Sequence, residues 1–80
     1  MHVPKTAPHH HKPTARTLRL ARVFARAVQL YEGDEAEARL WLSETNPALG
    51  GRAPMEMLDS EHGAALVEHL IGRLEHGVHS

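Results

Sequence analysis

Apolar residues recur at helical spacing in the first half of the chain. Thr14 is a typical helix N-cap, and Gly33 is placed to end a helix that runs to about Tyr31. Steps of three and four residues predict one apolar stripe, made of Leu20, Phe24, Ala27, Val28 and Tyr31 and widened by Leu18, Val23, Ala25 and Leu30. A helix so apolar is buried by several neighbours or by another chain. The remaining face is expected to carry Arg19, Arg22, Arg26 and Gln29.

A short second helix is predicted from about Glu35 to Ser43. Asp34 followed by Glu37 resembles a capping box, which typically begins a helix. The residues expected to face inward are Ala38, Trp41 and Leu42. Asn46-Pro47 breaks the pattern because a residue before proline avoids the helical region. Gly50-Gly51 then permits backbone angles that other residues resist.

Two further helices are predicted in the second half of the chain. Pro54 suits the first position of a third, short helix. Its apolar residues are Met55, Met57 and Leu58. The last helix starts at Asp59 or Ser60 and ends at Gly77, with a helical repeat of apolar residues. That repeat consists of Val67, Leu70, Ile71, Leu74 and Val78.

These elements predict an all-α domain, a small bundle of about four helices over residues 14–80. Gly63 and Gly72 would let another backbone approach the last helix, and no segment alternates with the period of a strand. Residues 1–13 hold three prolines and four histidines without apolar periodicity, so we expect a disordered, flexible tail. The run His9–His11 has no scaffold to converge on one ion, so no native metal site is expected.

Charge is strongly polarised along the chain. The 80 residues have a formal net charge of -1, but residues 1–31 carry six Lys and Arg and no acid. Residues 32–80 carry ten acids and three Arg. Such a split indicates an anionic partner for one end, or two solvated faces. The basic first helix and tail therefore keep open a small DNA-binding transcriptional regulator, although no recognition helix surrounds them.

Composition excludes several other classes of protein. Cysteine is absent, which removes disulfides, thiolate zinc sites and cysteine nucleophiles. No apolar run approaches the ~20 residues of a membrane span, and the first residues do not form a signal peptide, so we expect a cytoplasmic protein without membrane contact. So small a domain rarely encloses a catalytic pocket. We therefore expect neither an enzyme nor a cofactor.

Three Glu-His pairs recur every seven residues in the last predicted helix. They are Glu61-His62, Glu68-His69 and Glu75-His76. Seven residues return to nearly the same side of a helix, so the pairs predict a polar edge, either solvated or presented to a partner. Successive pairs stand about 10.5 Å apart, too far for two histidines to share a metal ion.

The order of residues from position 38 onward resembles a known family. The pattern is Ala38, Trp41-Leu42, Asn46, Leu49-Gly50-Gly51, Pro54, Met57-Leu58, Gly63, Val67 and His76-Gly77. It is similar to the toxin-binding domain of the Xre/MbcA/ParS antitoxins, and the resemblance covers about residues 15–80.

The resemblance implies an antitoxin of a type II toxin–antitoxin pair. Family partners are RES-domain toxins, which consume NAD, so a hetero-oligomer is expected. Related antitoxins place their C-terminal end near the toxin active site, a role that would fall here on Arg73, Glu75, His76, Val78, His79 and Ser80. The turn from Asn46 to Arg52 is the second expected contact surface. Many relatives carry a helix-turn-helix domain that binds promoter DNA; none is evident here, so DNA is the weaker expectation.

Overall fold

The computed structural model of the protein describes residues 13–79, with side chains to residue 77. Within this range, a side-chain cap begins each of the first two helices. Helix α1 (Ala15–Leu30) starts after Thr14, whose Oγ1 accepts a hydrogen bond from the Thr17 amide at 3.0 Å. Helix α2 (Glu35–Ser43) starts after Asp34 in the same way. Both N-terminal boundaries agree with the prediction, because capping depends only on nearby residues.

A tight turn follows α2 and projects from the bundle. It contains the 3-10 helix η2 (Pro47–Leu49), which is framed by an isolated antiparallel bridge between Asn46 and Arg52. The Asn46 amide donates to the Arg52 carbonyl at 3.0 Å. Gly50 and Gly51 have φ angles of +70° and +84°, a left-handed conformation that glycine adopts without strain. We call residues 46–52 the 46–52 turn.

The third and fourth predicted helices are η3 (Pro54–Asp59), a 3-10 helix, and α3 (Glu61–His79). Ser60 caps α3 by accepting the Gly63 amide at 3.0 Å. A Cβ atom on Gly63 would collide with the carbonyl oxygen of Met57, so the predicted close approach of backbones at Gly63 is confirmed. The same prediction is wrong for Gly72, whose Cβ would meet no backbone.

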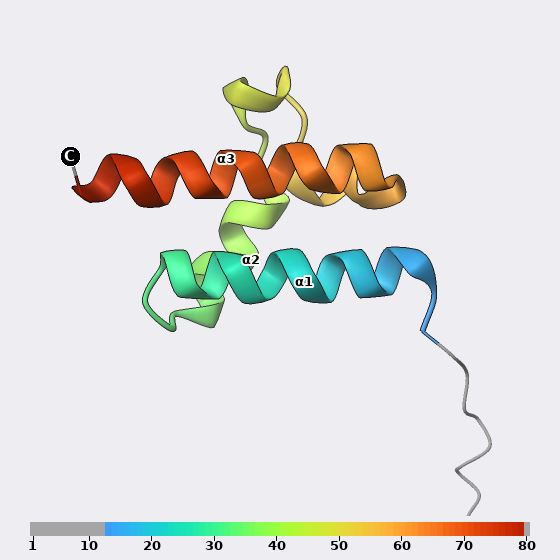
Figure 1. Cartoon of the computed structure of the whole chain (residues 1–80), viewed down its shortest axis with the longest axis horizontal. Helices are drawn as coiled ribbons and strands as arrows, with labels where there is room; N and C mark the ends of the chain where they lie inside the picture. The colour runs from blue at the N-terminus through green and yellow to red at the C-terminus, as the bar shows by residue number, and fades with distance from the viewer. Residues whose placement is uncertain (1–12, 80) are drawn as a thin grey trace, which may run out of the picture.

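Helices α1 and α3 lie side by side and run in the same direction, while α2 crosses behind them and contacts α1 and η3 (Figure 1). The core lies where these elements meet. It consists of Val23, Ala27, Ala38, Leu42, Leu58, Ala64, Val67 and Ile71. The described residues contain no strand, and the predicted all-α class is confirmed. The predicted tail lies outside the described residues, apart from Pro13.

The predicted stripe of α1 faces the core: Ala27 is buried, and Leu20, Phe24, Val28 and Tyr31 are partly buried against it. The most buried line of the helix, however, lies to one side of that stripe. It runs through Arg19, Val23 and Ala27, while Leu18 is 55% exposed. The prediction that Arg19 belongs to the polar face was therefore wrong, because α3 and η3 cover that side of α1. In α2, Ala38 and Leu42 are buried as predicted, whereas Trp41 is only partly buried against the core.

Candidate functional site

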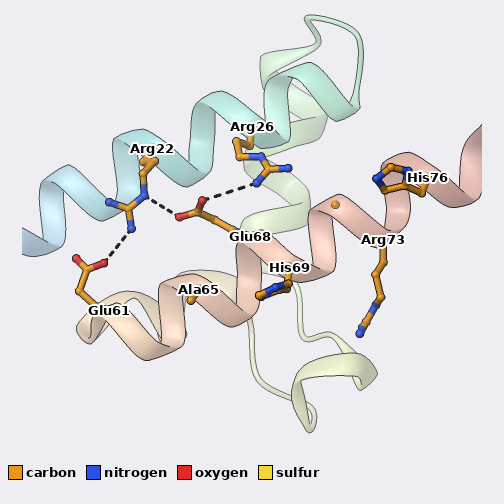
Figure 2. Close-up of a pocket in the computed structure, with 9 residues that line it drawn as sticks. Arg22, Arg26, Glu61, Ala65, Glu68, His69, Arg73 and His76 are labelled. Carbon is orange, nitrogen blue, oxygen red and sulfur yellow. Dashed lines mark hydrogen bonds and ion pairs between the residues drawn. The ribbon is translucent and has the colours of Figure 1, made fainter.

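Ion pairs join α1 to α3 and involve the three glutamates that recur every seven residues. Figure 2 shows the pairs that Arg22 and Arg26 form with Glu61 and Glu68. Arg22 Nε lies 2.7 Å from Glu68 Oε2, and its Nη2 lies 3.2 Å from Glu61 Oε1. Arg26 lies 3.7 Å from Glu68 and 3.3 Å from Glu75. We call this set the ion ladder; it contains Arg16, Arg19, Arg22, Arg26, Asp59, Glu61, Glu68 and Glu75.

The ion ladder changes the interpretation of both charged halves. The glutamates of the predicted polar edge of α3 all pair with arginines of α1; Glu68 and Glu75 are partly covered, whereas Glu61 stays largely exposed to solvent. Arg19 and Arg26 are seven residues apart, the same spacing as the glutamates of α3. Because the two helices run in the same direction, this equal spacing lets both arginines meet glutamates. A phosphate group that approached these arginines would have to compete with carboxylates already in place. This weakens the case for the first helix as a DNA-binding surface.

Arg19 is the buried member of the ion ladder. Its Nε donates to the Leu58 carbonyl at 2.7 Å, and its Nη2 donates to the Asp59 carbonyl at 2.9 Å. Its Nη1 lies 3.3 Å from Glu61, and this hydrogen bond lowers the pKa of the Glu61 carboxyl. The hydrogen bond to Glu68 likewise raises the pKa of the Arg22 guanidinium. Arg19 therefore fixes the junction between η3 and α3.

The residues predicted for the C-terminal site divide into two groups. Arg73 and His76 are exposed on α3, whereas Glu75 pairs with Arg26 at 3.3 Å and is only partly exposed. Glu75 is therefore partly covered by α1, and its role as a toxin contact stays a prediction. The side chains of Val78 and His79, together with Ser80, lie outside the described part of the chain.

Asn46 and Arg52, predicted for the second surface, have different surroundings. Asn46 Oδ1 accepts a hydrogen bond from the Ala48 amide at 3.0 Å, so this side chain shapes the 46–52 turn. Arg52 is exposed and its Nε lies 3.6 Å from Glu56 Oε1.

The structure brings Arg73 and the 46–52 turn together around a hollow that the sequence did not reveal. This apolar groove has a volume of about 400 Å³ and is lined by Ala48, Leu49, Met57, Leu66, His69, Leu70 and Arg73. Leu66 is 41% exposed at its surface. The sequence feature that could have indicated this groove is Leu49-Gly50-Gly51, because two glycines favour a tight turn and the leucine before them lies at its surface.

A second groove, lined mainly by charged residues, lies between α1 and α3 over the ion ladder. Its volume is about 610 Å³ and its lining includes Arg22, Glu68 and Gly72. His69 and Arg73 line both grooves and project from the side of α3 that faces away from α1 (Figure 2). They form the ridge between the two hollows.

Neither a metal site nor a membrane span is found in the described residues. No group of three metal-ligating side chains gathers within residues 13–79, and the His9–His11 run lies outside that range. None of the described helices is both long enough and apolar enough to span a bilayer. Because the predicted residue Arg73 lines the apolar groove, we take the surface formed by this groove, the His69–Arg73 ridge and the end of α3 as the candidate site.

Comparison with known proteins identifies the family. The model of the antitoxin Xre/MbcA/ParS C-terminal toxin-binding domain matches residues 26–77. A protein named Antitoxin Xre from Yersinia enterocolitica is 48% identical over 65 residues, which make up 81% of this chain and 44% of that protein. Another Antitoxin Xre, from Photorhabdus laumondii, is 45% identical over 63 residues, 79% of this chain and 43% of its own length. The chain thus spans less than half the length of these curated relatives. Since the family model covers well over half of the chain, the chain belongs to the Xre/MbcA/ParS antitoxin family, as its C-terminal toxin-binding domain.

Proposed function

We propose that this chain acts as the antitoxin of a type II toxin–antitoxin pair and neutralises a RES-domain toxin that degrades NAD. Its C-terminal end would cover the toxin active site. Support comes from the family membership and from two relatives named as antitoxins. The partner is then a protein, and the working form is a hetero-oligomer of antitoxin and toxin.

One structural observation carries the proposed mechanism. Helix α3 continues past the end of α1, so its last turns stand beyond the body of the bundle (Figure 1). Towards this end of α3, the described residues His76 and Gly77 are exposed. A single helix with side chains is about 10–12 Å wide. An object of this width can enter a cleft, whereas the whole bundle would be stopped at the rim.

Charge at the same end of the molecule suits such a cleft. An enzyme that consumes NAD binds a dinucleotide, so its cleft must favour two phosphates. Helix α1 ends beside α3 without a basic residue in its last turn, so no side chain there offsets the partial negative charge of its carbonyl end. Glu32 directly follows this end. Opposite potentials of this kind favour the correct orientation of two proteins.

The test separates binding from inhibition. A variant truncated after Gly77 keeps every residue of the ion ladder and of both grooves. We expect it to co-purify with its cognate RES-domain toxin, while NAD consumption by the mixture resumes. His62→Ala, an exposed histidine in the first turn of α3, is the matched control and should inhibit like the parent.

Two results would contradict the proposal at different levels. Full inhibition by a folded truncated variant would mean that another surface blocks the toxin. Failure of the parent to bind the toxin or to reduce its NAD consumption would refute the assignment of the partner.

A further inference from the structure

We infer that the apolar groove holds an apolar side chain of the toxin, and that Arg73 on its rim pairs with a carboxylate of the same toxin segment. This inference rests on the proposed function and adds to it a docking site separate from the end of α3. The C-terminal end would then inhibit, while the groove would supply much of the affinity.

The groove has the features of a preformed anchor site. Its wall is apolar on both sides, with Leu49 from the 46–52 turn and Leu66 from α3. Leu66 remains 41% exposed, so burying it would remove apolar surface from water. The hydrogen bonds of Asn46 to the Arg52 carbonyl and from the Ala48 amide fix the turn. A rigid groove loses little conformational entropy when it binds, which favours affinity.

Arg73 provides the charge that defines the partner. Each of the other arginines forms an ion pair with an acidic side chain, whereas no ion pair or hydrogen bond of the Arg73 side chain is found among the described residues. Its guanidinium is exposed at the junction of both grooves. A guanidinium matches a carboxylate through two parallel hydrogen bonds. The expected occupant is therefore a segment with a large apolar residue next to Asp or Glu.

A second copy of this chain fits the groove less well than such a segment. Contact between two copies through the same surface is usually two-fold symmetric. Because His69 and Arg73 form one rim of the groove, a symmetric contact there would bring two arginines close together. Like charges that face each other across an interface oppose association.

The experiment measures the affinity of full-length variants for the purified RES-domain toxin by calorimetry, with thermal melts of each variant to confirm folding. Leu66→Ser should weaken binding by about tenfold or more, as loss of a central apolar contact does. Leu40→Ser is the matched control: Leu40 is 49% exposed on α2, away from the groove, and affinity should stay within about twofold of the parent.

Arg73 variants test the carboxylate. Arg73→Glu should weaken binding more than Arg73→Gln, since reversal adds repulsion to the loss of the pair, and Arg73→Lys should keep part of the affinity. If Arg73→Glu and Arg73→Gln bind the toxin equally well, Arg73 does not pair with a toxin carboxylate. If Leu66→Ser binds as tightly as the parent, the groove does not hold a toxin side chain. Self-association of the parent that Leu66→Ser abolishes, with toxin affinity unchanged, would assign the groove to a second copy instead.

The outcomes remain distinct from those of the proposed function. Truncation after Gly77 should relieve inhibition with little change in affinity, whereas groove variants should change affinity first. If the parent inhibits the toxin and all groove variants bind normally, the groove inference alone is wrong. If the parent does not bind the toxin, the proposed function is wrong and the inference falls with it.

Discussion

Replacing Arg19 with methionine is expected to destabilise the protein by about 2–4 kcal/mol. Methionine keeps the unbranched aliphatic stem but removes the donors to the carbonyls of Leu58 and Asp59, at 2.7 and 2.9 Å. Hydrogen bonds to a charged group contribute about 1.5–3 kcal/mol each, so two losses amount to about 3–6 kcal/mol. Part of this loss is offset, because the variant no longer has to desolvate a guanidinium that is 9% exposed.

Urea denaturation followed by circular dichroism measures this difference directly. Arg52→Met is the control, because Arg52 forms an exposed pair with Glu56 four residues on, and such pairs contribute about 0.3–0.5 kcal/mol. Arg19→Lys keeps the charge without the planar fork and should fall between the two. An Arg19→Met variant as stable as Arg52→Met would refute the view that Arg19 holds the η3–α3 junction.

Three other predictions concern stability. Gly63→Ala should destabilise by about 1–3 kcal/mol, because the new Cβ would collide with a backbone oxygen of η3. Gly72→Ala, whose Cβ would have no neighbour closer than 3.8 Å, should be neutral or stabilising by up to about 1 kcal/mol; equal melting temperatures for the two variants would contradict this. The pKa of Glu61 is lowered in the folded protein, so on acidification the unfolded chain takes up this proton before the folded protein does. The contribution of Glu61 to stability is therefore present above about pH 4.3 and is lost as the pH falls. Below that pH, the melting temperature of Glu61→Gln should therefore fall less steeply than that of the parent. If the two melting temperatures fall with the same slope below pH 4.3, about the ordinary pKa of glutamate, the prediction is wrong. Trp41→Ala should destabilise by about 2–3 kcal/mol, less than for a fully buried tryptophan; a melt within a few degrees of the parent would mean that Trp41 contributes little to the core.

Helix starts could be predicted from the sequence because their causes are local. Thr14 and Asp34 each accept an amide hydrogen bond from a residue three positions on. Pro54 begins η3, as its fixed φ angle favours. The prediction that α3 ends at Gly77 was less accurate, because the helix continues to His79 although glycine typically ends a helix.

The burial of Arg19 could not be predicted because its partners lie about forty residues away. Arginine is rarely buried unless it is paired, and nothing near Arg19 in sequence supplies carbonyls without partners. Those carbonyls belong to Leu58 and Asp59, where η3 ends before α3 begins. The seven-residue spacing of the glutamates was visible, but only the parallel packing of α1 and α3 assigns them to the arginines.

The candidate site was predictable only in part. Arg73 was found through the family resemblance, and the structure leaves it exposed. Glu75 was included for the same reason, but its place in the ion ladder depends on the position of Arg26. Leu66 was missed because it lies beside the core stripe of α3, and its exposure depends on how far the 46–52 turn reaches over the helix.

The ion ladder also affects how the protein meets its partners at a distance. Opposite charges held 2.7–3.7 Å apart form short dipoles, whose field decays faster than that of separate charges. Beyond a Debye length of about 8 Å in physiological salt, the basic helix and its acidic neighbour largely cancel. Long-range steering, which accelerates the encounter of strongly charged proteins, is therefore weak for this face. Encounter rates with any partner that meets α1 and α3 should consequently depend little on ionic strength.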